Sequence, residues 1–69
     1  MSDNAHIARD YARTFSGASG RAVIAHLRAM TIERWLGADA TDAQLRTLEG
    51  QRALVHQIEQ MITRGMRHE

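Results

Sequence analysis

The stretch TDAQLRTLEGQRALVHQIEQMITRG, residues 41–65, decides the fold of this chain. Its apolar residues recur every three or four positions, which predicts a long helix with one broad apolar face. Thr41 is expected as the N-cap, Asp42 suits the first turn, and Gly65 is expected to end the helix. The residues of the apolar face are Leu48, Leu54, Val55, Ile58, Met61 and Ile62.

Two shorter helices are predicted before residue 41. The first runs from about residue 4 to residue 15, with an apolar residue at every fourth position and Asp3 or Asn4 as its cap. The second begins at Gly20, with Ser19 as its N-cap, and carries an apolar stripe. The pattern therefore predicts a bundle in which two short helices cover part of a longer one.

The end of the second helix is ambiguous from the pattern. Its apolar stripe reaches Met30, and a continuation to Leu36 would be closed by Gly37. Thr31 and Ile32 weaken that continuation, because β-branched side chains lose rotamer freedom in a helix. The pattern therefore leaves Met30 and Leu36 as two alternative C-terminal ends of the second helix.

A glycine-rich break separates the first two helices. Gly17 suits the left-handed residue that commonly follows a helix. Backbone amides after Gly20 could bind phosphate at a helix N-terminus, but neither GxxxxGK[ST] nor a strand followed by GxGxxG is present. We therefore interpret the glycines as residues of a tight turn between helices.

Length and composition set the class of the protein. Sixty-nine residues form a single domain, 1–69, with flexible ends expected at 1–3 and 66–69. The expected fold class is all-α: a small three-helix bundle dominated by a helical hairpin. No apolar run approaches the roughly 18 residues that span a bilayer, and the first residues do not resemble a signal peptide. A chain so short, with no cysteine for a disulfide, is expected to gain stability from another chain.

One flank of the long helix carries a row of polar residues, Glu49, Arg52, His56 and Glu59. Two glutamates and a histidine resemble half of a carboxylate metal site, but Arg52 between them would repel a cation. A surface row of ion pairs is the favoured interpretation. No catalytic, metal-binding or cofactor-binding residue is expected, and the protein is not expected to be an enzyme.

Four apolar residues are candidates for contact with a partner: Ile32, Trp35, Leu36 and Met61. Trp35 is the only tryptophan, and tryptophan is enriched at interface hot spots. Gly50 interrupts the long helix, where glycine costs about 1 kcal/mol relative to alanine. Close approach of the second helix, or of a partner's backbone, would explain that glycine.

Two short motifs point to a family. The first is the aromatic residue Phe15, a short break, then Gly20-Arg21 before an aliphatic helix. The second is Glu49-Gly50-Gln51-Arg52, which opens another aliphatic stretch. Over roughly residues 11–64 the chain resembles the small podophage structural proteins typified by a Bordetella phage protein. An ion pair between Arg21 and Glu49, which would lock the hairpin, is a further expectation.

The resemblance implies a non-enzymatic virion component but does not give its place in the particle. We expect many symmetric copies in the head–tail region, bound to portal, adaptor or tail proteins, and a stage in the host cytoplasm during assembly. The alternative is a nucleic-acid-binding protein or an accessory protein for packaging or assembly. A formal charge of +1, from nine basic and eight acidic residues, and the apolar long helix make nucleic acid the less favoured partner.

Overall fold

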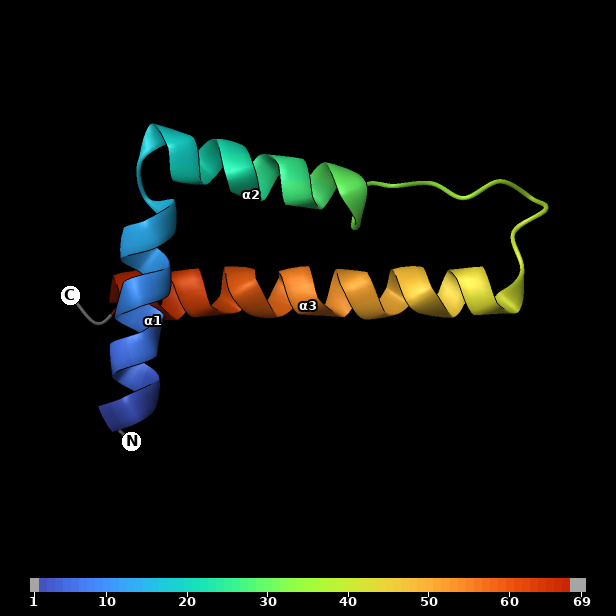
Figure 1. Ribbon diagram of the computed structural model, residues 1–69. Helices are drawn as coiled ribbons and strands as arrows, with labels where there is room; N and C mark the ends of the chain where they lie inside the picture. The colour runs from blue at the N-terminus through green and yellow to red at the C-terminus, as the bar shows by residue number, and fades with distance from the viewer. Residues whose placement is uncertain (1, 68–69) are drawn as a thin grey trace.

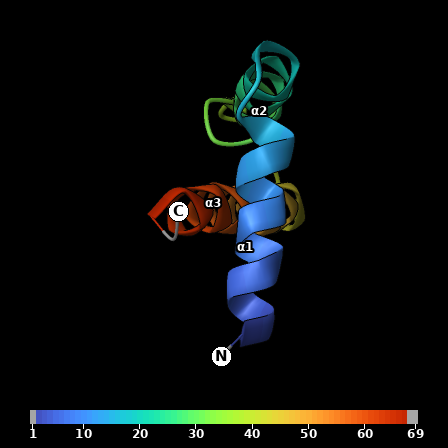
Figure 2. The same ribbon diagram turned by 90° about the vertical axis from the view of Figure 1, so that its left-hand side faces the viewer.

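Over residues 2–67, which the computed structural model describes, the chain forms three helices (Figure 1). These are α1 (Ser2–Phe15), α2 (Ala18–Met30) and α3 (Asp42–Arg67). α2 and α3 run antiparallel, and α1 lies across the C-terminal part of α3 (Figures 1 and 2). The predicted all-α fold, a small bundle containing a helical hairpin, is confirmed.

The start of α3 is fixed by a reciprocal pair of hydrogen bonds. The backbone N–H of Gln44 donates to the Thr41 hydroxyl at 3.1 Å, and the N–H of Thr41 donates to the Gln44 side-chain oxygen at 2.9 Å. This is a capping box, which satisfies two backbone donors at a helix N-terminus. The prediction of Thr41 as N-cap is confirmed, and Gln44 completes the motif.

Gly65 lies inside α3 and does not end it, so its assignment as a terminator is wrong. The residue is buried where α1 crosses α3. A Cβ atom there would lie 2.6 Å from the carbonyl carbon of Ala8 and 2.9 Å from the Cβ atom of Ala12. Ala8 and Ala12 are themselves buried, at 0% and 4% exposure. Three small residues thus allow two helix backbones to meet.

The turn between α1 and α2 also differs from the expectation. Gly17 is the N-cap of α2 with φ −79° and ψ 178°, an extended conformation, so the left-handed assignment is wrong. Ser19 lies inside α2, so it is not the cap. A Cβ atom on Gly20 would lie 2.5 Å from the Thr14 carbonyl oxygen. Gly20 therefore lets α2 turn tightly against the end of α1, which is the turn role expected of these glycines.

α2 ends at Met30, so the continuation to Leu36 is wrong. The hydroxyl of Thr31 donates to the Leu27 carbonyl at 2.7 Å, and Thr31 leaves the helix with φ −127° and ψ −76°. The N–H of Glu33 donates to the Arg28 carbonyl at 2.9 Å and closes the last turn. β-branched Thr31 and Ile32 thus favour the exit from the helix.

The outer ends of α1 and α3 extend beyond the expected limits. α1 already includes Asp3 and Asn4, so neither residue precedes the helix as a cap. α3 still includes Met66 and Arg67. Residues 1, 68 and 69 lie outside the described residues, and flexibility at the two ends stays a prediction.

The molecule is thin and buries few side chains. Its Cα atoms extend 46 × 28 × 12 Å with a radius of gyration of 14.4 Å, against about 11 Å for a compact domain of this length. The accessible surface is 5346 Å², about 1,000 Å² more than a compact monomer of this mass exposes. The apolar residues of the core are Ala8, Ala12, Leu48 and Val55.

Candidate protein-interaction surface

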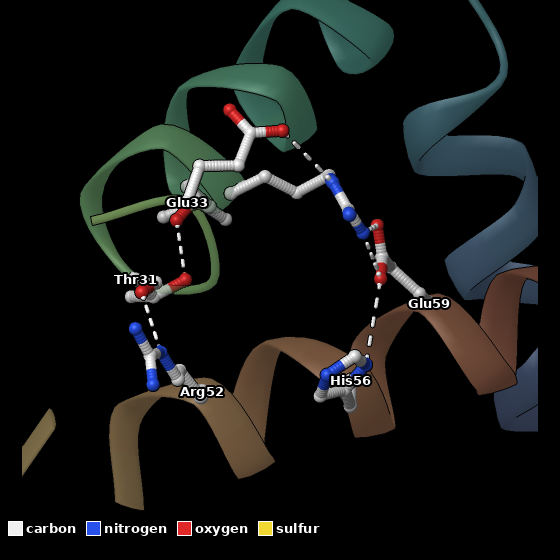
Figure 3. Close-up of polar contacts among 7 residues, drawn as sticks. Thr31, Glu33, Arg52, His56 and Glu59 are labelled. Carbon is white, nitrogen blue, oxygen red and sulfur yellow. Dashed lines mark hydrogen bonds and ion pairs between the residues drawn. The ribbon is translucent and has the colours of Figure 1, made fainter. Parts of the chain in front are cut away.

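Arg52 fastens the segment that follows α2 onto α3. Its Nε–H donates to the Thr31 carbonyl at 2.9 Å (Figure 3). Its Nη2 donates to the Arg34 carbonyl at 2.7 Å. Nη1 donates to Glu49 on the same helix at 3.0 Å. Hydrogen bonds from a charged donor are roughly twice as strong as neutral ones. We call this arrangement, Arg52 with the carbonyls of Thr31 and Arg34, the Arg52 clip.

Trp35 follows the second carbonyl of the clip directly. Its side chain is 90% exposed, the highest value among the large apolar residues of the described chain. The backbone on its N-terminal side is held by the Arg52 clip and by the hydrogen bond from the Arg34 N–H to the Thr31 carbonyl. A large aromatic side chain is thus presented to solvent from a backbone that is fixed beforehand, as at interface hot spots.

Two further candidates flank Trp35. Ile32 and Leu36 are both half-buried. Leu36 lines a cavity of about 580 Å³ between the loop and α3, together with Leu48. Three of the four candidates from the sequence therefore lie on one short segment, and its exposed member is Trp35.

Met61 belongs to a different surface. It is half-buried and lines a groove of about 360 Å³ with Ile7 and Tyr11 of α1 and with Leu54 and Ile58 of α3. We call this the α1–α3 groove. Leu54, at its open end, is 58% exposed.

α2 and α3 are joined by one ion pair across the hairpin. Nη1 of Arg28 donates to both carboxylate oxygens of Glu59 at 2.7 Å, and Glu33 lies 3.5 Å from Nε (Figure 3). The hydrogen bond and charge of Glu59 raise the pKa of Arg28 above its ordinary value. Arg28 thus pairs within the fold.

The predicted polar row on α3 is partly a row of ion pairs. Arg52 and Glu49 form the expected pair at 3.0 Å. His56 Nδ1 lies 3.9 Å from Glu59, a pair that requires a protonated histidine. Arg52 and Glu59 make their other contacts with the segment 28–34, across the hairpin. Among residues 5–67, whose side chains the structure describes, no group of three or more histidine, aspartate or glutamate residues is placed to hold a metal ion.

The expected pair between Arg21 and Glu49 is wrong. Arg21 donates from Nη1 to the Ser16 carbonyl and lies beside Met66 in a cavity near the end of α3. Because Arg28 faces Glu59 in an antiparallel hairpin, Arg21 faces a point about seven residues further along α3. Glu49 lies near the other end of that helix.

The remaining motif positions have distinct places. Phe15 ends α1 and stacks on Tyr11, with ring centroids 6.5 Å apart. A Cβ atom on Gly50 would meet nothing within 4 Å, so close approach of α2 at that glycine is wrong. The glycines in close contact are Gly20 and Gly65.

Two elements that organise this surface were absent from the sequence predictions. Ala8 and Ala12 were a sequence signal for the crossing at Gly65, because two small residues four positions apart share one face of α1. No signal in the sequence indicated the pair between Arg28 and Glu59, because that pair depends on the register of the hairpin.

Comparisons with known proteins give a family. The family model described as "Bbp19-like phage protein" matches residues 11–66. No curated protein and no solved structure shows a significant match. Of the helices in the described residues, none combines the length and the apolar character that crossing a membrane requires.

Proposed function

The chain belongs to the family of Bbp19-like phage proteins, and on this premise we propose that it is a non-enzymatic structural protein of the virion. Its partners are larger particle proteins of the head–tail region, namely portal, adaptor or tail proteins. The protein occupies the particle in many symmetric copies and assembles in the host cytoplasm.

The observation that carries the proposal is Trp35, 90% exposed on a segment fixed by the Arg52 clip. An exposed tryptophan on a mobile loop would lose conformational freedom on binding, which lowers affinity. Here hydrogen bonds to the backbone before Trp35 have already reduced that freedom. The thin shape and large accessible surface also favour a protein that gains stability from its neighbours.

The mechanism is adhesion. A buried tryptophan removes about 150–250 Å² from water, which corresponds to roughly 4–6 kcal/mol before the costs of association. After those costs, the free energy of binding that one copy gains from this contact is modest. Repeated copies on a symmetric particle engage together, and the effective concentration of each contact rises.

The experiment replaces Trp35 with a photoreactive phenylalanine derivative in phage-infected cells, followed by irradiation and mass spectrometry of the cross-linked products. We expect cross-links to a portal, adaptor or tail protein. The matched control places the same group at Leu45, an apolar residue of α3 that is 47% exposed, and should not give that product. Cross-links from position 35 to DNA would overturn the proposal in favour of a packaging role, and so would products confined to non-particle proteins.

A further inference from the structure

A second apolar groove lies between α2 and α3, at the end of the hairpin where α1 joins α2 (Figure 1). Its volume is about 450 Å³, within the range of roughly 300–1,000 Å³ that is common for binding sites. The apolar residues that line it are Phe15, Ile24, Ala25, Ile62 and Met66. Met66 is 59% exposed, so this groove opens to solvent beside a large uncovered side chain. We call it the α2–α3 groove.

The crossing of α1 over α3 leaves the α2–α3 groove accessible. α1 crosses α3 at Gly65. Glu59 and Thr63, which line the groove, point about 120° and 160° away from Gly65 around the helix. On the other wall, Ala25 of α2 is exposed. The groove and the crossing therefore occupy different flanks of α3.

Arg21 carries the unbalanced charge of this groove. Arg28 and Glu59 also line it, but they neutralise each other through the ion pair of the hairpin. Arg21 donates from Nη1 to the Ser16 carbonyl, and no carboxylate of the described residues pairs with it. Its Nε and Nη2 therefore keep free N–H donors among those residues. These two nitrogens form one edge of the guanidinium fork, which can hold a carboxylate with two parallel hydrogen bonds.

A basic hollow continues the groove along α3. It shares Glu59 and Thr63 with the groove, and it is also lined by Arg64 and Arg67 in the last turn of the helix. A compact ligand would fill one of the two hollows, whereas an extended chain can run through both. The shape therefore favours a peptide segment, and the arginines favour a segment that carries acidic residues.

We propose that the α2–α3 groove binds a peptide segment of another protein in which acidic residues adjoin large apolar ones. An apolar side chain of the segment lies against Phe15 and Ile62, and a neighbouring carboxylate binds the free edge of Arg21. Further acidic residues lie over the basic hollow. The inference goes beyond the proposed function, because it concerns a different surface from Trp35 and holds whichever protein Trp35 contacts.

The Gly20-Arg21 motif gains a role from this proposal. A Cβ atom on Gly20 would lie 2.5 Å from the Thr14 carbonyl oxygen, so glycine allows α2 to begin close to the end of α1. The Ser16 carbonyl in that turn then holds the guanidinium of Arg21. A cation in the first turn of a helix meets the positive end of the helix dipole, and the first turn of α2 has no acidic residue to offset it. A bound carboxylate supplies that offset.

Selection from a random peptide library tests the class of partner. The library is passed over the immobilised full chain, and the affinities of enriched peptides are measured by fluorescence anisotropy. We expect the enriched peptides to share an acidic residue beside a leucine, isoleucine or aromatic residue. Arg21→Gln should weaken their binding at least about tenfold, because a hydrogen-bonded charge pair is lost. The matched control is Arg46→Gln, which removes the same charge from an exposed arginine of α3 outside the groove and should bind normally.

A second pair of variants tests the apolar part of the groove. Ala25→Phe fills the groove from an exposed position and should abolish binding, while Ala22→Phe adds the same ring to an exposed position of α2 outside it and should not. Circular dichroism should show unchanged helices in both variants. Trp35→Ala should bind the peptides normally, so a failure of this inference is distinguishable from a failure of the proposed function.

Three results would overturn the inference. The first is a selection that enriches no acidic peptides. The second is peptide binding that Arg21→Gln and Ala25→Phe leave unchanged. The third is a chain that retains oligonucleotides or vesicles of anionic lipid through Arg21 but retains no peptide, which would assign this surface to phosphate groups.

Discussion

Gly65→Ala should destabilise the protein although alanine is the better helix former. The added Cβ atom would lie 2.6 Å from the carbonyl carbon of Ala8 and 2.9 Å from the Cβ atom of Ala12. Carbon atoms in contact sit about 3.5–4.0 Å apart, so α1 would have to move by roughly 1 Å. Overpacking of this kind costs about 1–3 kcal/mol and can exceed the gain of about 1 kcal/mol in helix propensity.

Gly50→Ala is the matched control, since it adds the same methyl group to the same helix where nothing lies within 4 Å. Thermal unfolding followed by circular dichroism, at concentrations low enough to keep the chain monomeric, compares the two variants. Gly50→Ala should raise Tm by roughly 4–8 °C, the shift expected for about 1 kcal/mol in a domain of this size. Gly65→Ala should lower it. A Tm that rises equally in both variants would refute the close crossing of α1 and α3 at Gly65.

Thr41→Ala removes the hydroxyl that accepts the Gln44 N–H, and chemical denaturation should show a loss of about 1 kcal/mol in the free energy of unfolding. Unchanged stability would contradict the capping box. Arg52→Lys cannot reproduce the guanidinium fork that reaches the carbonyls of Thr31 and Arg34, so the fluorescence anisotropy of Trp35 should fall. An unchanged anisotropy would show that the clip does not order the segment. Trp35→Ala should leave Tm within about 4 °C, because exposed substitutions change stability by no more than about 0.5 kcal/mol, and a larger fall would mean that Trp35 packs within the fold.

Local signals on α3 and α1 were sufficient to predict the helices. The three- and four-residue spacing of apolar side chains placed α3, and Thr41 marked the N-cap before its first residue, because both signals act within a few residues of the chain. The same holds for the end of α1 at Phe15.

The glycines show why other features could not be predicted. Gly65 resembles a helix terminator and Gly50 resembles a crossing point, yet the structure has the opposite arrangement. A glycine inside a helix carries no information about what approaches it. The role of such a glycine depends on the residue that packs against it. For Gly65 those residues are Ala8 and Ala12, more than fifty positions away in the sequence.

The register of the α2–α3 hairpin could not be predicted from the sequence either. The motif residues Arg21 and Glu49 were expected to pair, whereas Arg28 and Glu59 do so. The sequence pattern left the end of α2 ambiguous, and the hydrogen bonds of Thr31, its C-cap, end the helix at Met30. The prominence of Trp35 was visible in the sequence, but the Arg52 clip that positions it was not.

Quantitative mass spectrometry of purified mature particles of the parent phage tests the central claim most directly. The account predicts that the protein is present at a fixed ratio to the portal protein, reproducible between preparations and resistant to washing in high salt. Absence from mature particles, or a variable amount removed by salt, would contradict a structural role in the virion.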